Sequence, residues 1–218
     1  GMTIDCLRNV EAVSARCRHQ GTKEGLVGRE LGGKTVGIIG FGKIGRRAAE
    51  LFHAFGCPIL AYDSNPIAQM PDYVQQTSLD ELLRHADVVS LHCPLVESTR
   101  GLMNAERISM MKHRAILINT SRGEVVDGQA LRESGLQYVL DVWEHEPDLD
   151  PLLLRDALLA TPHIAGYSAQ GKANATALSV RTIGRYFGLS LGEWYPSNIA
   201  PSRPRAISWQ ELCDTIDD

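Results

Sequence analysis

The sequence predicts an α/β protein built on a doubly wound parallel sheet. From Lys34 onward, short apolar runs alternate with segments of helical periodicity. Runs such as VGIIG, VVSLH and AILIN are apolar at nearly every position, as in strands that helices cover on both faces of a parallel sheet. Strand and helix in alternation form right-handed βαβ units, which build this class of fold.

The alternating part of the chain is expected to hold six strands and four helices. The strands are expected at residues 35–40, 58–63, 87–92, 115–120, 138–142 and 158–161. The helices are expected at 44–55, 79–85, 105–111 and 128–133. In the first of these helices, the spacing predicts an inward face made of Ile44, Ala48, Leu51, Phe52 and Phe55.

The two ends of the chain differ from this pattern. Residues 4–18 are expected to form a helix, followed by a loop over GTKEGLVGRELGG. The apolar side of that helix would carry Ile4, Leu7, Val10 and Val13. A long helix is expected at 169–187, and its apolar stripe would carry Ala173, Ala177, Val180, Gly184 and Phe187. The proline-containing stretch YPSNIAPSRPR predicts an extended tail that leads to a short terminal helix.

Composition narrows the possible functions. A chain of 218 residues has room for one large domain, or a smaller one with an appendage. The net charge of −4 gives no reason to expect nucleic acid or a membrane surface as a partner. Five cysteines, without a C-x-x-C pair, predict neither a disulfide framework nor a metal site. With no apolar segment typical of a secretion signal, we expect a cytoplasmic protein.

The stretch KTVGIIGFGKIGRRAAE predicts a dinucleotide site. Gly40, Gly42 and Gly45 follow a predicted strand and open a predicted helix. Gly40 permits the tight turn, Gly42 lets the backbone approach a pyrophosphate, and Gly45 allows the helix to pack closely on the strand. Asp63 ends the next strand, where its carboxylate would bind the ribose hydroxyls and repel a 2′-phosphate. We therefore expect NAD in preference to NADP.

Polar residues at later strand ends are candidates for chemistry, because open α/β sheets bind ligands at this edge. Arg122 follows a strand and precedes a glycine, so its planar guanidinium could grip a carboxylate. Alcohol oxidation by hydride transfer also releases a proton, which histidine can accept near neutral pH. His163 is the preferred candidate, with Glu146 to orient its ring. His145, next to Glu146, remains a competitor.

These motifs resemble the D-isomer-specific 2-hydroxyacid dehydrogenases. GKTVGIIGFGKIG, VVSLHCPLVESTRGLMNAERISMMK, AILINTSRGEVVD, LDVWEHEP and TPHIAG occur in that family's order. The resemblance implies NAD as cofactor, a 2-hydroxy or 2-oxo acid as substrate and a homodimer. It implies that Arg122 binds the oxo acid, His163 exchanges the proton and Glu146 supports His163. The cofactor contacts that it implies are Gly40, Gly42, Lys43, Ile44, Gly45, Asp63, Cys93, Pro94, Thr120, Ser121, Arg122, Asp141, His163 and Gly166.

Within the family, the second half of the chain is most similar to the erythronate-4-phosphate dehydrogenases of pyridoxine biosynthesis. That similarity implies 4-phosphoerythronate as substrate and Tyr167 as a substrate contact. The opening stretch looks closer to phosphoglycerate-type members. The family's N-terminal substrate domain is expected to be largely absent, because residues 4–18 match its linker helix. A non-catalytic NAD-sensing module and a degenerate gene fragment therefore remain alternative hypotheses.

The chain is expected to divide into four parts. They are a linker helix and loop remnant at 1–30, an NAD-binding domain at 31–167, a long helix at 168–190 and an extended tail at 191–218.

Overall fold

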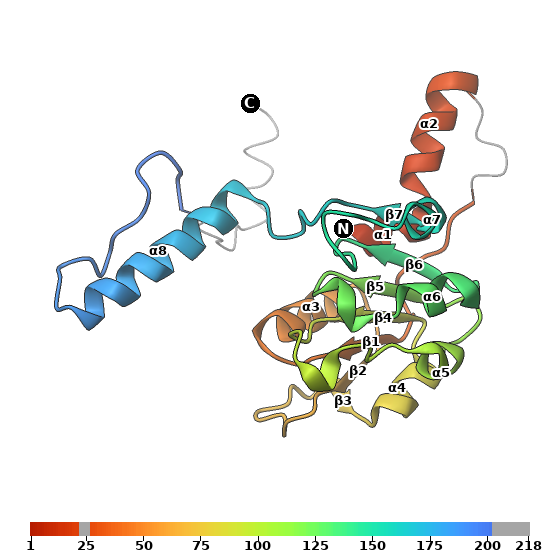
Figure 1. Cartoon of the computed structure of the whole chain (residues 1–218), viewed down its shortest axis with the longest axis horizontal. Coiled ribbons are helices and arrows are strands. Elements are labelled where there is room, and N and C mark those ends of the chain that lie inside the picture. The colour runs from red at the N-terminus through yellow and green to blue at the C-terminus, as the bar shows by residue number, and fades with distance from the viewer. Residues whose placement is uncertain (22–26, 202–218) are drawn as a thin grey trace, which may run out of the picture. The chain divides into compact units, whose positions relative to one another are not determined.

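A seven-stranded parallel sheet forms the core of the first 164 residues. The computed structural model describes residues 1–21 and 27–201. The sheet has the strand order β3-β2-β1-β4-β5-β6-β7, and every neighbouring pair is parallel (Figure 1). The strands are β1 (Val36–Ile39), β2 (Ile59–Tyr62), β3 (Val74–Gln76), β4 (Val88–Leu91), β5 (Ile116–Asn119), β6 (Gln137–Leu140) and β7 (Leu159–Ala160). The predicted doubly wound α/β class is confirmed.

The helices are α1 (Met2–Arg8), α2 (Val10–Gln20), α3 (Lys43–Ala54), α4 (Leu79–His85), α5 (Ala105–Ser109), α6 (Gly128–Ser134), α7 (Pro151–Asp156) and α8 (Ala169–Tyr186). Helices α3 to α7 lie in connections between these strands, whereas α1 and α2 precede β1 and α8 follows β7. Two 3₁₀ turns, η1 (Glu97–Thr99) and η2 (Gly123–Val125), follow the ends of β4 and β5. The six predicted strands and four predicted helices are all present, whereas β3 and α7 were not predicted.

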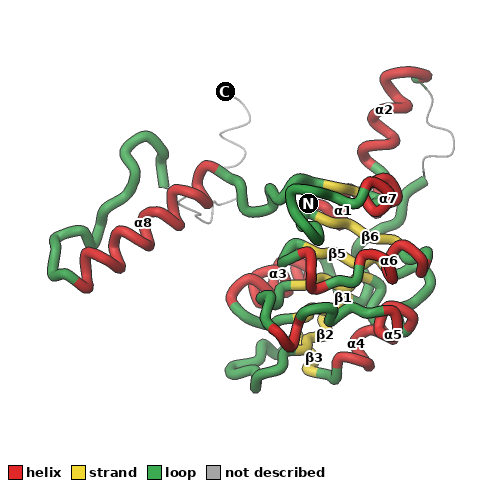
Figure 2. The backbone as a smooth tube through the Cα atoms, viewed as in Figure 1, coloured by secondary structure: helices red, strands yellow, loops and turns green. Residues whose placement is uncertain are grey.

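Two apolar clusters cover the two faces of the sheet. Alternate side chains of β1 point to opposite faces, with Ile39 in one cluster and Val36 and Ile38 in the other. Helices α4, α5, α6 and α7 contribute to the cluster around Ile39, and α1 and α3 to the cluster around Ile38. Figure 2 shows α3 on one side of the strands and α4, α5 and α6 on the other. Burial on both faces explains why the strands read as continuous apolar runs.

The inward face of α3 differs from the prediction. Ile44 is 72% exposed, and Leu51 and Phe55 are also exposed, whereas Gly45 and Ala49 are buried. A Cβ atom at Gly45 would lie 2.0 Å from the carbonyl oxygen of Gly40. The helix therefore packs on the sheet through its smallest residues, and this close approach turns the larger side chains outward. Of the predicted inward residues, only the half-buried Ala48 and Phe52 pack against the apolar cluster.

The predicted N-terminal helix is two helices. The break falls at Asn9, whose φ of 51° places it in the left-handed region, outside the helical range. Leu7 before the break is buried, but Val10 after it is 50% exposed. The expected single apolar side is therefore wrong beyond Leu7. The loop predicted after this segment has no helix or strand at residues 27–33, and its residues 22–26 lie outside the described part.

Within its described residues, the chain separates into two compact units, residues 1–164 and 165–201. The second unit holds α8, whose Ala173, Ala177 and Gly184 are buried as expected. Phe187 is wrongly placed on the predicted stripe, because it follows the helix end and is 68% exposed. Residues 190–201 form turns and irregular structure that bonds back to α8, from the Tyr195 hydroxyl to Oδ1 of Asn174 and from Nε of Arg181 to the Trp194 carbonyl, so the described part of the expected extended tail is not extended. The expected terminal helix lies outside the described residues. Among the described helices, none is long and apolar enough to cross a membrane.

Candidate functional site

The candidate residues gather at one edge of the sheet. Because all strands are parallel, the segments that follow them emerge at the same carboxyl edge. Gly40 follows β1, Asp63 follows β2, Thr120 follows β5 and Asp141 follows β6. His163 lies just beyond β7. The fold therefore places residues more than 100 positions apart along one edge.

The glycine turn after β1 has the shape that a phosphate cradle requires. Gly40 has φ 90°, and a Cβ atom there would lie 2.6 Å from the backbone nitrogen of Cys93. A Cβ atom at Gly45 would lie even closer, 2.0 Å from the Gly40 carbonyl oxygen, so both positions need glycine. A Cβ atom at Gly42 would meet no atom within 4 Å, which leaves open space at the first turn of α3. Backbone N–H groups at such a helix N-terminus favour an anion.

Asp63 is bonded to this turn. Its Oδ2 accepts a hydrogen bond from the backbone N–H of Phe41 at 2.8 Å. Its Oδ1 accepts one from the backbone N–H of Asn65 at 2.9 Å. The two bonds hold the half-buried carboxylate beside the glycine turn, where the sequence placed it.

Arg46 secures the loop that follows Asp63, a role that sequence reasoning missed. Its guanidinium donates to the carbonyl of Gln69 at 3.0 Å and to the carbonyl of Ala68. The same group lies 4.9 Å from the ring centroid of Phe41. Its position directly after the third glycine of the motif was the signal available in the sequence. These contacts tie the loop after β2 to α3 and the glycine turn.

His163 and Glu146 form a hydrogen-bonded pair. The Nδ1 atom of His163 lies 2.8 Å from Oε2 of Glu146. A carboxylate oxygen accepts, so Nδ1 carries the proton and Nε2 remains as the nitrogen that can exchange one. The Oε1 atom of Glu146 accepts from the backbone N–H of Trp143 at 2.8 Å. Since both carboxylate oxygens have these partners, the geometry favours His163 over the exposed His145.

The backbone at His163 is held in an unusual conformation. His163 has φ 57°, a left-handed value that costs free energy for a residue with a side chain. Its backbone N–H donates to the carbonyl of Asp141 at 2.7 Å. The buried Asp141 also accepts, through Oδ1, from the Thr161 hydroxyl at 2.6 Å and from the Ile164 N–H at 2.8 Å. Asp141, predicted as a cofactor contact, therefore orders the turn that carries His163.

Arg122 is presented by a second ordered turn. Arg122 directly precedes η2, and the residue is exposed to solvent. Its Nη1 donates a hydrogen bond to the carbonyl of Ser121 at 2.6 Å. Asn119, which is fully buried, donates from Nδ2 to the Arg122 carbonyl at 2.8 Å. Its Oδ1 accepts from the N–H and hydroxyl of Ser121 at 3.0 and 2.9 Å. Sequence reasoning missed Asn119, although a polar residue inside an apolar strand was the available signal.

The other predicted contacts differ in exposure. Lys43, Ile44 and Pro94 are exposed, Thr120 is half-buried, and Cys93 and Ser121 are buried. Burial raises the pKa of the Cys93 thiol, which disfavours a reactive thiolate. Gly166 and Tyr167 belong to the second unit, where the Lys172 ammonium lies 3.7 Å from the Tyr167 ring centroid.

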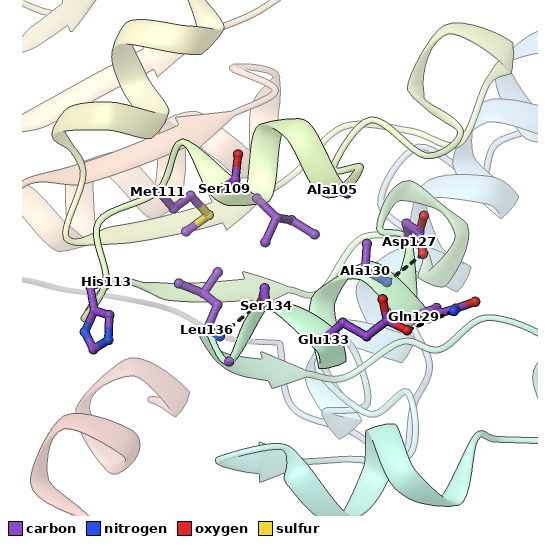
Figure 3. A pocket seen from close by; sticks show the side chains of 12 residues that line it. Ala105, Ser109, Met111, His113, Asp127, Gln129, Ala130, Glu133, Ser134 and Leu136 are labelled. Carbon is purple, nitrogen blue, oxygen red and sulfur yellow. Dashed lines mark hydrogen bonds between the residues drawn. The ribbon is translucent and has the colours of Figure 1, made fainter.

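A sizeable cavity lies away from this edge. It has a volume of about 660 Å³ and opens between α5 and α6 (Figure 3). Asp127 and Gln129 on its wall bond within their own helical segment, to the Ala130 N–H and the Glu133 carboxylate. The cavity contains none of the predicted site residues.

The carboxyl edge thus combines a glycine cradle, a carboxylate placed for a ribose and a histidine–carboxylate pair. A sheet of this topology with these groups defines a dinucleotide-binding domain of an oxidoreductase. The residues fit the cofactor: Gly42 leaves room for a pyrophosphate, and Asp63 lies beside it without a neighbouring cation in Ser64–Pro66.

Comparison with known proteins defines the class further. The family model for the D-isomer specific 2-hydroxyacid dehydrogenase, NAD binding domain, matches residues 1–165. This chain belongs to that family, and NAD is its cofactor.

Individual relatives agree with this assignment. The chain is 39% identical over 200 residues to a hydroxypyruvate reductase of Thermotoga maritima, covering 87% of this chain and 65% of that protein. It is 44% identical over 171 residues to an erythronate-4-phosphate dehydrogenase of Chromohalobacter salexigens, covering 74% and 44%. The chain therefore spans between 44% and 65% of the length of these two proteins.

Solved structures show the same fold. A D-lactate dehydrogenase from Aquifex aeolicus, complexed with NAD and lactic acid, has a TM-score of 0.76 at 31% identity. The match covers 86% of this chain and 63% of that one. D-2-hydroxyisocaproate dehydrogenase has a TM-score of 0.78 at 30% identity, covering 88% and 64%.

Proposed function

We propose that this chain carries the NAD-binding and catalytic half of a D-2-hydroxyacid dehydrogenase. The observation that carries the proposal is the 2.8 Å bond between His163 and Glu146 at the sheet edge that also holds the glycine cradle. NAD, when bound, supplies the acceptor for the hydride that leaves C2 of the substrate. His163 accepts the proton of the substrate hydroxyl, and Arg122 binds the negatively charged substrate carboxylate.

The proton leaves through His163. Oxidation of the alcohol releases one hydride from C2 and one proton from the hydroxyl oxygen, and Nε2 of His163 takes the proton. Glu146 keeps the other nitrogen protonated and stabilises the imidazolium that forms. In the direction of ketone reduction, the same imidazolium returns the proton to the oxygen.

Arg122 holds the substrate carboxylate. Its guanidinium offers planar, paired donors that match a carboxylate, and the turn fixed by Asn119 presents it at the end of β5. A cation at this position also draws electron density toward the carboxyl end of the substrate. Binding and proton transfer are thus assigned to residues on different strand ends.

For the cofactor, we propose contacts with the residues that the resemblance implied. Gly40, Gly42 and Gly45 would cradle the pyrophosphate together with Lys43 and Ile44, and Asp63 would bind the ribose. The remaining proposed contacts are Cys93, Pro94, Thr120, Ser121, Arg122, Asp141, His163 and Gly166.

The finer assignments rest on the relatives. The erythronate-4-phosphate dehydrogenases among them support 4-phosphoerythronate as substrate, and hence a role in pyridoxine biosynthesis, with Tyr167 as a substrate contact. The hydroxypyruvate reductase supports a smaller 2-oxo acid instead. We further propose a cytoplasmic homodimer.

The experiment is an assay of the native gene product for NADH formation on a panel of D-2-hydroxy acids that includes 4-phosphoerythronate. We expect turnover of at least one acid, and a loss of turnover in His163→Asn that is much larger than the accompanying loss of NAD affinity. NAD binding without turnover of any acid would contradict the proposal and favour a non-catalytic NAD-binding module. Turnover of other acids but not of 4-phosphoerythronate would reject only that substrate.

A further inference from the structure

We infer that Trp143 is a positioning residue that fixes the geometry of the Glu146–His163 pair, an inference that rests on the proposed function. Trp143 follows β6 and is only 3% exposed. It donates two hydrogen bonds, one from the backbone and one from the side chain. The backbone N–H bonds to Oε1 of Glu146 at 2.8 Å, and the indole Nε1–H bonds to the carbonyl of Thr161 at 3.0 Å.

These bonds close a ring through the catalytic pair. Glu146 bonds to Trp143 through one oxygen and to His163 through the other. Thr161 lies two positions before His163 in the chain and accepts the indole bond. Neither Glu146 nor the segment carrying His163 can shift alone without breaking a bond to Trp143. Asp141 orders the turn that carries His163, and Trp143 links this turn to the orienting carboxylate of Glu146.

The third candidate catalytic residue is connected to the same point. Gly123 follows Arg122, and a Cβ atom there would lie 1.9 Å from the carbonyl carbon of Trp143. The backbone after Arg122 therefore rests directly on the backbone of Trp143. Trp143 contacts the loops after β5, β6 and β7, which carry Arg122, Glu146 and His163 respectively.

A substitution with phenylalanine separates the effect of the Trp143 indole N–H donor from the effect of the volume that the side chain fills. Phenylalanine at this position would still fill apolar space in the core, and the backbone bond to Glu146 would remain. Only the bond to the Thr161 carbonyl would be lost, so the segment leading to His163 would keep its bonds to Asp141 but lose its link to Trp143. Displacement of a catalytic group by about 1 Å can cost on the order of 100-fold in rate. We expect Trp143→Phe to lower kcat roughly 10- to 100-fold.

The chain offers a matched control in Tyr138. Its hydroxyl donates to the carbonyl of Leu153 at 3.0 Å, and its ring lies in the same apolar cluster as Trp143. Tyr138→Phe therefore also removes one buried aromatic donor from a backbone carbonyl. Its partner, however, belongs to α7 and not to a loop that carries a catalytic residue.

The test compares the native gene product with its Trp143→Phe and Tyr138→Phe variants. We measure kcat, KM for the 2-hydroxy acid, the Kd for NAD and the pH profile of kcat. Trp143→Phe should lower kcat and alter the pH profile while KM and Kd stay unchanged, and Tyr138→Phe should change none of the four. An unchanged kcat in Trp143→Phe, or equal losses in both variants, would overturn the inference.

A second measurement does not depend on turnover. If the wild-type protein oxidises no acid, the proposed function fails, but NMR of the imidazole nitrogens of His163 in the 218-residue chain still decides whether Trp143 positions the ring. The hydrogen-bonded Nδ1–H signal should weaken or shift in Trp143→Phe and stay unchanged in Tyr138→Phe. An unchanged signal in both variants would overturn the positioning role.

If Trp143→Phe does not fold, the wild-type chain supplies the readout. The indole N–H signal of Trp143 should move as His163 is titrated, while that of Trp194 serves as the internal reference. A Trp143 signal that does not respond would overturn the inference.

Discussion

The carboxylate of Asp63 accepts a hydrogen bond from the backbone N–H of Phe41 at 2.8 Å. This bond joins the end of β2 to the glycine turn that ends β1. The group proposed to bind the ribose and the turn proposed to bind the pyrophosphate are therefore one connected unit.

Replacing Asp63 with arginine should reverse the preference between the cofactors. Asp63→Arg removes the charged acceptor for the ribose hydroxyls and supplies a cation for a 2′-phosphate. We expect NAD affinity to fall about 10-fold or more, in line with the loss of a charged hydrogen bond. Calorimetric titration with NAD and NADP measures both affinities. Asp72→Arg, an equal charge change at an exposed position, is the control, and equal NAD affinity in wild type and Asp63→Arg would refute the assignment.

Arg46 should matter for cofactor binding although it is not proposed to touch the cofactor. Arg46→Met removes the bonds that hold the carbonyls of Ala68 and Gln69, so the loop after Asp63 gains freedom. We expect NAD affinity to fall roughly 3- to 10-fold, the value of about one hydrogen bond. The neighbouring Arg47 is exposed and pairs with Glu50, so Arg47→Met is the matched control. If both variants bind NAD equally well, the proposed role of Arg46 is wrong.

Alanine substitutions at two glycines of the motif should have different effects, one on stability and the other on NAD binding. Gly45→Ala forces a Cβ atom against the Gly40 carbonyl and should lower the free energy of unfolding by roughly 1–3 kcal/mol or more. Gly42→Ala meets no protein atom, so stability should be retained while NAD binding is lost. Thermal unfolding and calorimetry separate the two effects. Normal NAD affinity in Gly42→Ala would contradict the cradle.

His92 should make stability depend on pH. Burial lowers the pKa of His92 from 6.5 to about 4. Between these values the unfolded chain binds a proton that the folded chain does not, so stability is full above pH 6.5 and falls as the pH is lowered toward about 4. His92→Gln should weaken this dependence. The test is to measure the unfolding temperatures of the wild type and of His92→Gln between about pH 4 and pH 6.5. An identical dependence on pH in the two proteins would show that His92 does not contribute.

The sequence was sufficient for the fold and for the edge of the sheet at which the candidate site lies. Parallel strands buried on both faces leave a strong apolar signal, and the glycine spacing leaves another. Because the strands are parallel, placing Asp63 and His163 at strand ends also placed them at one edge. The pairing of His163 with Glu146 was predicted and is observed as a hydrogen bond.

Strand β3 and helix α7 were not predicted because they are too short to show a periodic pattern of apolar residues. Strand β3 has three residues and lies at the edge of the sheet, so that only Val74 is buried. Helix α7 has six residues, too few for a helical period to be recognised. The predicted inward face of α3 was wrong because large apolar residues were assigned to it. The close backbone contact at Gly45 allows only small residues on that face.

The sequence carries a signal for Asn119 and Arg46 as residues, but the partners of the supporting residues could not be found from it. Asn119, Trp143 and Arg46 act through backbone carbonyls and amides of segments that are distant in the chain or irregular in shape. Nothing in residue type or spacing specifies such partners. They become visible only when the loops after neighbouring strands are seen side by side.

The most direct test of the central claim is a calorimetric titration of the folded 218-residue chain with NAD. We expect saturable binding at one site, abolished in Gly42→Ala and weakened in Asp63→Arg. A folded chain that takes up no NAD, or that binds it equally in wild type and Gly42→Ala, would contradict the claim.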